Sequence, residues 1–492
     1  MENNLSQALQ EKYPHLEVSV LRLSEVQKDN EKDRIDAEFF SKNFIVAYQK
    51  IKNMNYLPLY ECLELLTDYH ANGNYELLSS NVTLQDTKDY AYMIRTTDLE
   101  KMDFENEVKY ISKHAYNFLS KTKVFGGEVV INKIGNPGAS YFIPFLNKPI
   151  SLGMNLFLLR TNDKLNSAFL YIFLNTNLGK IIIERKVNGA VPQTIDKEAI
   201  KSLPIPILPI EFQLEIEKMV KDSHKALEES KELYKKAEET LYLELGLDPK
   251  NPLQSLLDSK IDHSTKSLNI SIRTLKKSFL KTGRLDSEYY QKKYEINEKI
   301  IMNKKYTILD NLVSITKSIE PGSNLYKNKG IPFIRVANLT QYGLSEGDVF
   351  LDEKDFFSQY LQILYPKKDT ILFSKDGSVG IAYCVKEDKE VVTSSAILHL
   401  NIKDKENILP EYLTLFLNSI FAKLQAQRDC GGSIISHWRI EDIKKILVAI
   451  LDIKTQEKIA KYIQESFNLR KKSKQLLDNA KIKVEEQIQG KT

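Results

Sequence analysis

The most constraining feature of the sequence is that its second half repeats its first. RIDAEFF at residues 34–40 returns as RLDSEYY at residues 284–290. Further along, the matches keep a single offset: Phe173-Leu174-Asn175 returns as Phe416-Leu417-Asn418, 243 residues later. The matching segments occur in the same order in both halves, which indicates a duplication rather than chance. A chain of 492 residues allows two to four domains, and the duplication predicts two equivalent ones.

Each half begins with a part that is rich in strand signals. Short apolar runs next to glycine-bearing turns are typical of strands. We expect such strands within residues 126–132, 154–159, 369–374 and 395–400. Helical spacing of apolar residues follows at 168–186 and 411–428. Residues 203–209, LPIPILP, are expected to be extended because each proline disfavours helix in the residue before it.

A long helix is predicted at the end of each half, over residues 210–245 and 453–489. Apolar and small residues recur there at alternating steps of four and three, which is the spacing of a coiled-coil seam. The seam positions are Ile216, Val220, Ser223, Leu227, Ser230, Tyr234, Ala237 and Leu241, with Ile459, Ile463, Ser466, Ser473, Leu477, Ala480 and Val484. Small residues at every seventh position let two helix backbones approach closely. We expect the helices to pair; the alternative is that each packs only on its own domain.

These patterns predict an α+β fold with two duplicated mixed α/β domains and two long coiled-coil-like helices. The expected division is an N-terminal segment (1–34), a first domain (35–208), a first helix (209–247), a connecting segment (248–283), a second domain (284–451) and a second helix (452–492).

Composition narrows the possible classes of protein. The 70 Lys and Arg against 66 Asp and Glu leave a net charge of +4, which neither requires nor forbids a nucleic-acid partner. Cys62, Cys384 and Cys430 form no CxxC pair and are expected to be buried and reduced. The histidines form no HExxH motif, so no metal site is predicted. We expect no secretory signal and no membrane span, which favours the cytoplasm.

Motifs for catalysis are not found. Asp248-Pro249-Lys250-Asn251 is the nearest approach to the tetrapeptide of an amino-methyltransferase, and it follows Gly246, where a helix end explains it better. The turn at residues 135–138 lacks the Lys-Ser/Thr of a phosphate-binding loop. Asp376 with residues 387–389 forms a loose nuclease-like pattern that the first half does not repeat, and a nuclease stays open as a minor alternative.

Polar residues recur where the two halves match, beside the glycine turns, after a strand and in the glycine loops. Arg and Lys can read guanine edges in the major groove, Asn and Gln can read adenine edges, and other groups can neutralise phosphates. The candidate DNA-binding residues are Arg95, Thr96, Lys133, Asn136, Lys186, Asn188, Gln193, Thr194, Arg335, Asn338, Lys375, Ser378, Arg428, Ser433, Ser436 and His437. For each of them alone, a role in the surface or in a turn is the alternative.

Together, several segments resemble the specificity (S) subunit of a Type I restriction-modification system. They are residues 188–195 (NGAVPQTI), residues 203–209 (LPIPILP), and Gln213 with Ile216 at the helix entry. They are similar to the family's glycine–glutamine segment, its I-P-x-P strand and its E-Q-x-x-I helix entry, with Phe212 in place of the usual Glu. The second copies, at residues 431–436, 446–450 and 456–459, lack the prolines. The resemblance covers residues 15–490.

The resemblance implies a non-catalytic subunit. Residues 35–208 and 284–451 would be target recognition domains that each read one half of a bipartite site on double-stranded DNA. The long helices would pack antiparallel as a spacer. The chain would hold no cofactor of its own and would position two methyltransferase (M) subunits, which use S-adenosylmethionine to methylate adenine N6. Restriction (R) subunits that use ATP and Mg²⁺ would join them. The alternative function is a coiled-coil scaffold whose duplicated heads bind proteins.

Overall fold

The computed structural model describes residues 8–18, 20–30, 32–104, 108–189, 191–259, 272–357, 360–430 and 436–490. The chain divides into two compact units. Unit 1 comprises Met1–Ala226 with Lys471–Thr492, and unit 2 comprises Leu227–Arg470. Each unit therefore contains one strand-rich domain and half of each long helix. The division expected from the sequence, into consecutive segments, assigned each long helix to a segment of its own.

Three small sheets form the strand-rich domain of unit 1. The first pairs β1 (Tyr56–Pro58) with β10 (Pro204–Pro206). The second has the order β2-β9-β6-β7, from Leu63–Asp68, Leu156–Thr161, Val129–Asn132 and Ser140–Phe142. The third has the order β4-β3-β8-β5, from Lys109–Ile111, Ala91–Ile94, Ile150–Leu152 and Lys123–Val124. Strands β3 and β8 run parallel, and every other pair in unit 1 is antiparallel.

Unit 2 repeats this topology. Strand β11 (Tyr306–Ile308) pairs with β21 (Leu447–Ala449). A four-stranded sheet has the order β12-β20-β17-β18, from Val313–Lys317, Ile397–Ile402, Ile371–Ser374 and Ala382–Cys384. In the third sheet β13 (Ile331–Ile334) lies between β16 (Phe350–Leu351) and β19 (Val392–Thr393), and β13 and β19 are again parallel. The pair β14-β15 (Leu339–Thr340, Gly343–Leu344) is added in unit 2.

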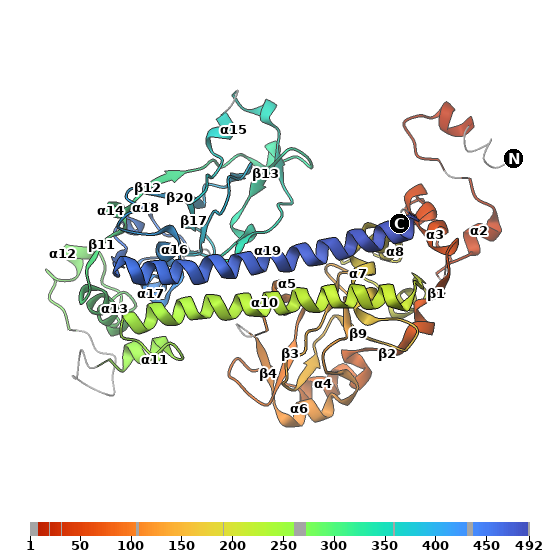
Figure 1. Cartoon of the computed structure of the whole chain (residues 1–492), viewed down its shortest axis with the longest axis horizontal. Helices are drawn as coiled ribbons and strands as arrows, with labels where there is room; N and C mark the ends of the chain where they lie inside the picture. Colours follow the sequence, from red (N-terminus) through yellow and green to blue (C-terminus); the bar gives the residue numbers. More distant parts are fainter. Residues whose placement is uncertain are drawn as a thin grey trace. The chain divides into compact units, whose positions relative to one another are not determined.

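Helices cover these sheets at matching places in the two units (Figure 1). Units 1 and 2 begin their domains with α3 (Lys42–Lys52) and α13 (Lys292–Met302). The helix expected at 168–186 is divided into α7 (Ser167–Asn175) and α8 (Asn177–Glu184). Thr176 is extended there, with φ −68° and ψ 163°, and its hydroxyl accepts a hydrogen bond from the Gly179 amide at 3.0 Å. In unit 2 Ser419 divides α16 (Pro410–Asn418) from α17 (Ile420–Asp429). It is also extended, with φ −76° and ψ 168°, but its hydroxyl donates to the Phe416 carbonyl at 2.6 Å instead of capping the next helix.

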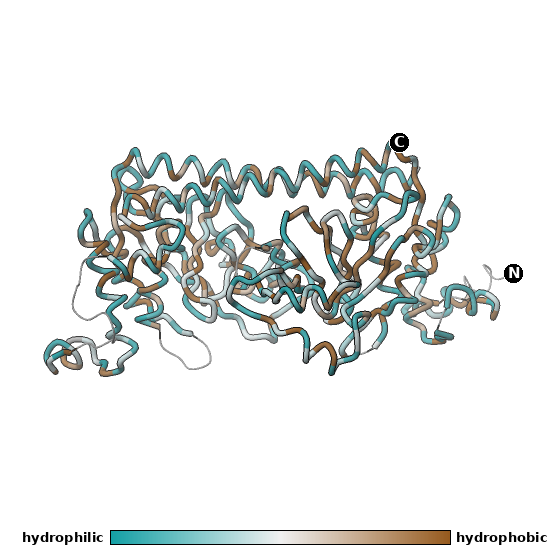
Figure 2. Tube along the Cα trace, turned by 90° about the horizontal axis from the view of Figure 1, so that it is seen from below, coloured by the Kyte–Doolittle hydropathy of each residue, from teal (hydrophilic) through white to brown (hydrophobic). Residues whose placement is uncertain are grey.

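The long helices are α10 (Ile210–Glu244) and α19 (Ile453–Gln489). In unit 1 the Ser223 hydroxyl donates to the Ser473 carbonyl at 2.9 Å, and in unit 2 the Ser466 hydroxyl donates to the Ser230 carbonyl at 2.8 Å. Ser223 of α10 contacts Ser473 of α19, whereas the later residue Ser230 contacts the earlier residue Ser466. The two helices therefore run antiparallel. Figure 2 shows hydrophilic stretches alternating with apolar positions along both of them.

Seam residues contribute to the core of each unit. The expected seam residues are buried, except Leu227 and Leu477, which are half-buried. In unit 1 Ile216, Val220, Ala480 and Val484 join the cluster that contains the sheet residues Val129 and Phe157. In unit 2 Tyr234, Ala237, Leu241, Ile459 and Ile463 join the cluster that contains Phe373 and Leu398. The prediction of an α+β fold with duplicated domains and paired long helices is confirmed.

Two smaller expectations concern single residues and membrane helices. Cys62 and Cys384 are buried and Cys430 is half-buried, and all three are free thiols. Gly246 adopts φ +79° just beyond the end of α10, which fits its role in ending that helix. Among the described helices, none combines the length and the apolar run that crossing a bilayer requires.

Candidate nucleic-acid interface

In unit 1 two polar segments that lie far apart in the sequence meet beside β6. The glycine turn at residues 135–138 follows β6, and the loop at residues 188–194 follows α8. Ile134 and Thr194 form an antiparallel bridge, and the Ile195 amide donates to the Lys133 carbonyl at 3.1 Å. Thr194 in turn closes the loop on Asn188 through two backbone hydrogen bonds of 2.8 Å. The turn and the loop therefore form one surface.

Unit 2 builds the same junction. Asp376 and His437 form an antiparallel bridge, and the Trp438 amide donates to the Lys375 carbonyl at 2.8 Å. The Gly377 amide donates to the Ser436 carbonyl at 2.9 Å. The duplicated sequence thus places a glycine turn and a polar loop side by side in both units.

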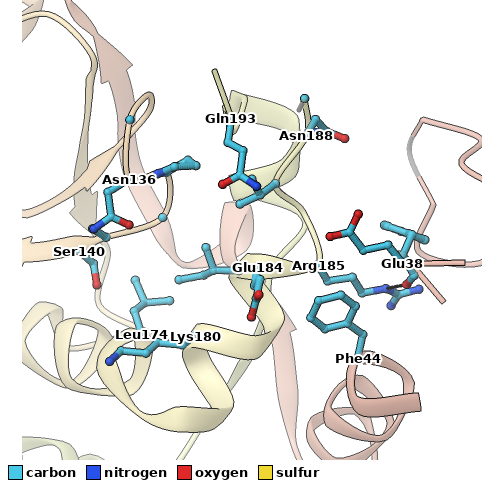
Figure 3. A pocket seen from close by; sticks show the side chains of 18 of the residues that line it. Glu38, Phe44, Asn136, Ser140, Leu174, Lys180, Glu184, Arg185, Asn188 and Gln193 are labelled. Atoms are coloured by element: carbon cyan, nitrogen blue, oxygen red, sulfur yellow. Dashed lines mark hydrogen bonds between the residues drawn. The ribbon is translucent and has the colours of Figure 1, made fainter. Parts of the chain in front are cut away.

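A hollow of about 1130 Å³ opens beside this junction in unit 1 (Figure 3). Three of the predicted DNA-binding residues, Asn136, Asn188 and Gln193, line it. Figure 3 shows Asn136 on the turn, Gln193 on the loop, and Lys180 and Glu184 on α8. The side chains of Asn136 and Gln193 are exposed. The hollow is lined by amides and charged groups together with apolar side chains such as Phe44 and Leu174.

The RIDAEFF repeat forms another part of this hollow. Arg34 makes two hydrogen bonds of 2.7 Å to Asp36, and they lower the pKa of the Asp36 carboxyl to about 2. The Arg34 guanidinium lies over the Phe39 ring, 4.8 Å from its centroid, and Arg185 lies over the same ring at 4.3 Å. Cation–π contacts of this kind stabilise a guanidinium that lies against an aromatic ring. The repeat therefore fastens the start of the domain to α8.

The second copy of the repeat makes the matching arrangement. Arg284 pairs with Asp286 through hydrogen bonds of 2.6 and 2.9 Å, and hydrogen bonds from Arg284 lower the pKa of the Asp286 carboxyl. The Tyr289 ring lies near two guanidiniums, Arg284 at 4.9 Å and Arg428 at 5.5 Å. Arg428 also pairs with Glu298, and with Asp429 at 2.8 Å. This arginine, a predicted DNA contact, has its charge balanced inside the domain.

Lys133 belongs to an ion-pair cluster next to the turn. Its ammonium lies 3.1 Å from Asp68, and Lys197 lies 3.0 Å from the other oxygen of the same carboxylate. Burial opposes ionisation of Asp68, but the hydrogen bonds from Lys197 and Lys133 outweigh it, so the pKa of this carboxyl lies below its usual value. Two lysines on one carboxylate leave a positive charge at the edge of the polar surface.

The predicted residues after strands β3 and β13 form turn contacts. The Arg95 amide donates to the Asp98 carboxylate, and the Arg95 guanidinium donates to the same carboxylate at 2.6 Å. The Thr96 hydroxyl donates to the Asn132 side chain at 3.1 Å. In unit 2 the Arg335 amide donates to the Asn338 side chain at 3.0 Å. The Arg335 guanidinium bonds Asp348 at 2.7 and 2.8 Å. Both arginines organise the turn that follows their strand.

The remaining candidates differ in their access to solvent. Lys186 and Lys375 are buried, and Lys186 donates to the Asp29 carbonyl at 3.2 Å. Ser378 and His437 are exposed, while Ser436 is half-buried. Ser433 lies outside the described residues. DNA contact by any of these residues stays a prediction.

The nuclease-like pattern does not come together as a metal site. Asp376 pairs with Lys375 and His437, Glu387 bonds Lys389 at 2.6 Å, and Asp388 lies 3.3 Å from Lys367. Within the described ranges, no group of three or more His, Cys, Asp and Glu residues is arranged to hold a metal ion. The acidic residues of this pattern instead form ion pairs with basic neighbours.

Some features of the polar surface were not predicted from the sequence. Asp68 and Arg34 were not expected there, and the RIDAEFF repeat was the available signal for Arg34. The meeting of turn and loop was also not expected, because a backbone bridge between segments that are 60 residues apart leaves no local pattern.

The fold defines a two-domain protein with one polar turn-and-loop surface in each domain and a pair of long helices divided between them. The family model described as "Type I restriction modification DNA specificity domain" matches the chain twice, over residues 66–239 and 303–479. Each match covers most of one strand-rich domain and part of the long helix that follows it. The chain belongs to this family.

Solved structures show similarity over most of the chain. The S subunit of a Type I restriction-modification system from M. genitalium is 14% identical, with a TM-score of 0.36, and the match covers 88% of this chain and 96% of that one. The HsdS subunit from Thermoanaerobacter tengcongensis is 12% identical, with a TM-score of 0.27 and coverage of 89% and 97%. No curated protein matches the chain.

Proposed function

We propose that the chain is the sequence-reading subunit of a Type I restriction-modification complex. Its two domains each read one half of a bipartite site on double-stranded DNA. The observation that carries the proposal is the double match of the DNA specificity domain, once in each half of the duplicated chain. A bipartite target is the natural ligand of two equivalent domains that differ in their surface residues.

The proposal includes the partners and their chemistry. Two methyltransferase subunits with S-adenosylmethionine methylate adenine N6, and restriction subunits with ATP and Mg²⁺ cleave unmodified DNA. The chain itself selects the sequence and holds no catalytic group. An adenine that is methylated must leave the base stack, so this chain binds the surrounding sequence while a partner subunit takes the base. The complex works in the cytoplasm, on cellular and invading DNA.

The test is a map of N6-methyladenine in the genome of the cell that encodes this chain, by single-molecule sequencing. Deleting the gene is expected to remove methylation from one motif with two specified halves and an unspecified spacer. Restoring the gene must restore the motif. Methylation that is unchanged after deletion would contradict the proposal, and a scaffold with protein-binding heads would then be favoured.

A further inference from the structure

We propose that Asn136 and Gln193 form an amide pair that reads an A·T base pair in the half-site bound by unit 1. The inference rests on the proposed function and goes further, because it assigns one position of the target to two side chains. The base pair in question is one other than the methylated adenine, which leaves the stack.

Asn136 and Gln193 lie on two segments that are joined beside one hollow. Asn136 lies on the glycine turn and Gln193 on the loop, and the bridge between Ile134 and Thr194 fastens the two segments together. Both side chains line the same hollow and both are exposed (Figure 3). Within the described part of the chain, neither amide group makes a hydrogen bond to another residue. Their donors and acceptors are therefore available to a ligand.

The two arginines around the hollow have other partners. The Arg34 guanidinium bonds Asp36 and donates to the Val187 carbonyl at 3.1 Å. Arg185 is buried against aromatic rings and donates to the Phe39 carbonyl at 3.2 Å. Because these guanidiniums are occupied, the arginine contact to guanine O6 and N7 is not available here. Lys180 is exposed on α8 and suits a phosphate, which sets position rather than sequence.

The amides are also held on closed turns. A Cβ on Gly138 would lie 2.1 Å from Cγ2 of Ile183, so the turn lies directly on α8. Gly138 donates to the Asn132 carbonyl at 2.9 Å, and the loop is closed by the Asn188–Thr194 pair. A primary amide offers one donor and one acceptor side by side, which complements N7 and N6 of adenine in the major groove. Because the turns are already closed, binding requires ordering of the two side chains but not of the backbone that carries them.

Unit 2 carries different groups at the matching places. Ser378 stands where unit 1 has Asn136, and Ser436 stands where unit 1 has Gln193. His437 pairs there with Asp376, whereas unit 1 has Thr194 and Ile134. The two domains therefore present different groups at this place, and a change of the amides is expected to affect only the half-site bound by unit 1.

The experiment replaces the chromosomal gene with Asn136→Ala or Gln193→Met and maps N6-methyladenine by single-molecule sequencing. Each variant is expected to keep the bipartite motif but to accept other bases at one A·T position in one half, the same position for both. The ratio of methylation at sites with a different base pair there to methylation at sites with the A·T pair should be at least tenfold higher in each variant than in the wild type. Asn177→Ala is the matched control, because Asn177 is an exposed amide of unit 1 outside the hollow.

Each other outcome overturns the inference. An unchanged motif in both variants shows that the amides read no base, while the wild-type motif still supports the proposed function. Weaker methylation at all sites, with no position relaxed, shows a contact to the DNA backbone. If the two variants lose base preference at different positions of the motif, each amide contacts a different base pair. If the wild-type chain supports no bipartite motif, the proposed function itself fails, and the inference with it.

Discussion

Gly135 and Gly138 in the turn of unit 1 differ in the space that a side chain would have. Both have φ +90°, a conformation that L side chains rarely adopt. A Cβ on Gly135 would meet nothing within 4 Å, whereas a Cβ on Gly138 would overlap Ile183. In unit 2 a Cβ on Gly380 would meet only Trp438, at 3.9 Å. The two copies of the turn are therefore packed differently against their helices.

Gly138→Ala is expected to cost more stability than Gly135→Ala, by about 1–3 kcal/mol, because it adds a steric overlap to the same backbone strain. Denaturant unfolding of both variants measures this difference. In unit 2 Gly380→Ala and Gly377→Ala should differ by less, since both lack a close contact. Equal losses for Gly138→Ala and Gly135→Ala would show that the turn moves away from α8.

His399 makes unit 2 sensitive to acid. Its ring nitrogen lies 2.9 Å from the Thr393 hydroxyl, and burial lowers the pKa of the imidazole to about 4. In the unfolded chain histidine takes up its proton near pH 6.5. Between these two values the unfolded state binds more protons, so the free energy of unfolding falls as the pH falls from about 6.5 to about 4. One pKa unit corresponds to 1.36 kcal/mol, which gives a total of roughly 3 kcal/mol at most.

His399→Gln keeps a partner for Thr393 and removes this proton uptake. We expect its unfolding free energy to depend less steeply on pH than that of the wild type over this interval. Denaturant titrations at several pH values from 4 to 7 compare the two slopes. Identical slopes would contradict a buried neutral imidazole.

For single residues, the sequence predicted where some candidates lie better than it predicted which of them are accessible to a ligand. Asn136 and Gln193 follow from the match between the halves and do line one hollow. The same match selected Lys375, which is buried, and Lys186, another of the candidates, is buried as well. A polar residue that recurs in both halves can stabilise the shared fold instead of binding a ligand. Whether its side chain is buried depends on tertiary packing, which a short motif does not reveal.

At the scale of elements, the helix pair is built around buried hydroxyls. Ser223 with Ser473 and Ser230 with Ser466 lie 2.8 and 3.1 Å apart between their hydroxyl oxygens. Each pair also bonds a backbone carbonyl of the other helix. Buried hydroxyls satisfied in this way cost little, and their small size brings the helices close together.

Ser230→Leu should destabilise unit 2 by about 1–3 kcal/mol, because the larger side chain has no room between the helices. Ser230→Ala should cost about 1 kcal/mol or less, since Ser466 still has the Ser230 carbonyl as its acceptor. Chemical denaturation followed by circular dichroism measures both. Glu232→Leu, at an exposed position of α10, is the control for a leucine on this helix. A Ser230→Leu chain as stable as this control would refute close packing at the serines.

Elements with a long periodic pattern were predictable, and their interruptions were not. The expected helices at 210–245 and 453–489 agree with α10 and α19 to within a residue. The break at Thr176 was missed, because the apolar residues before and after the Asn175-Thr176-Asn177 segment keep an almost unchanged helical spacing. Gly179 was the available signal in unit 1, because a Cβ there would lie 2.0 Å from the Phe173 carbonyl oxygen. Unit 2 makes its own break with Ala422 at the matching position, so the requirement for glycine belongs to the backbone of unit 1.

At the scale of the whole molecule, both long helices take part in both units. Unit 1 buries Ile216 and Val220 of α10 together with Ala480 and Val484 of α19. Unit 2 buries Tyr234 and Leu241 of α10 together with Ile459 and Ile463 of α19. Each domain therefore depends on residues from both ends of the duplicated sequence, and neither half of the chain contains all of its own core.

This division determines how a recognition domain can be exchanged. Replacing residues 35–208 with those of a relative should change one half of the methylated motif and leave the other half unchanged. The graft should also lose stability, because the new domain meets helix residues selected for the old one. Adding the relative's residues at positions 216, 220, 480 and 484 should restore the melting temperature without a further change of the motif. Methylation maps and thermal unfolding of both chimaeras check this, and a change in both halves of the motif would show that the domains do not read DNA independently.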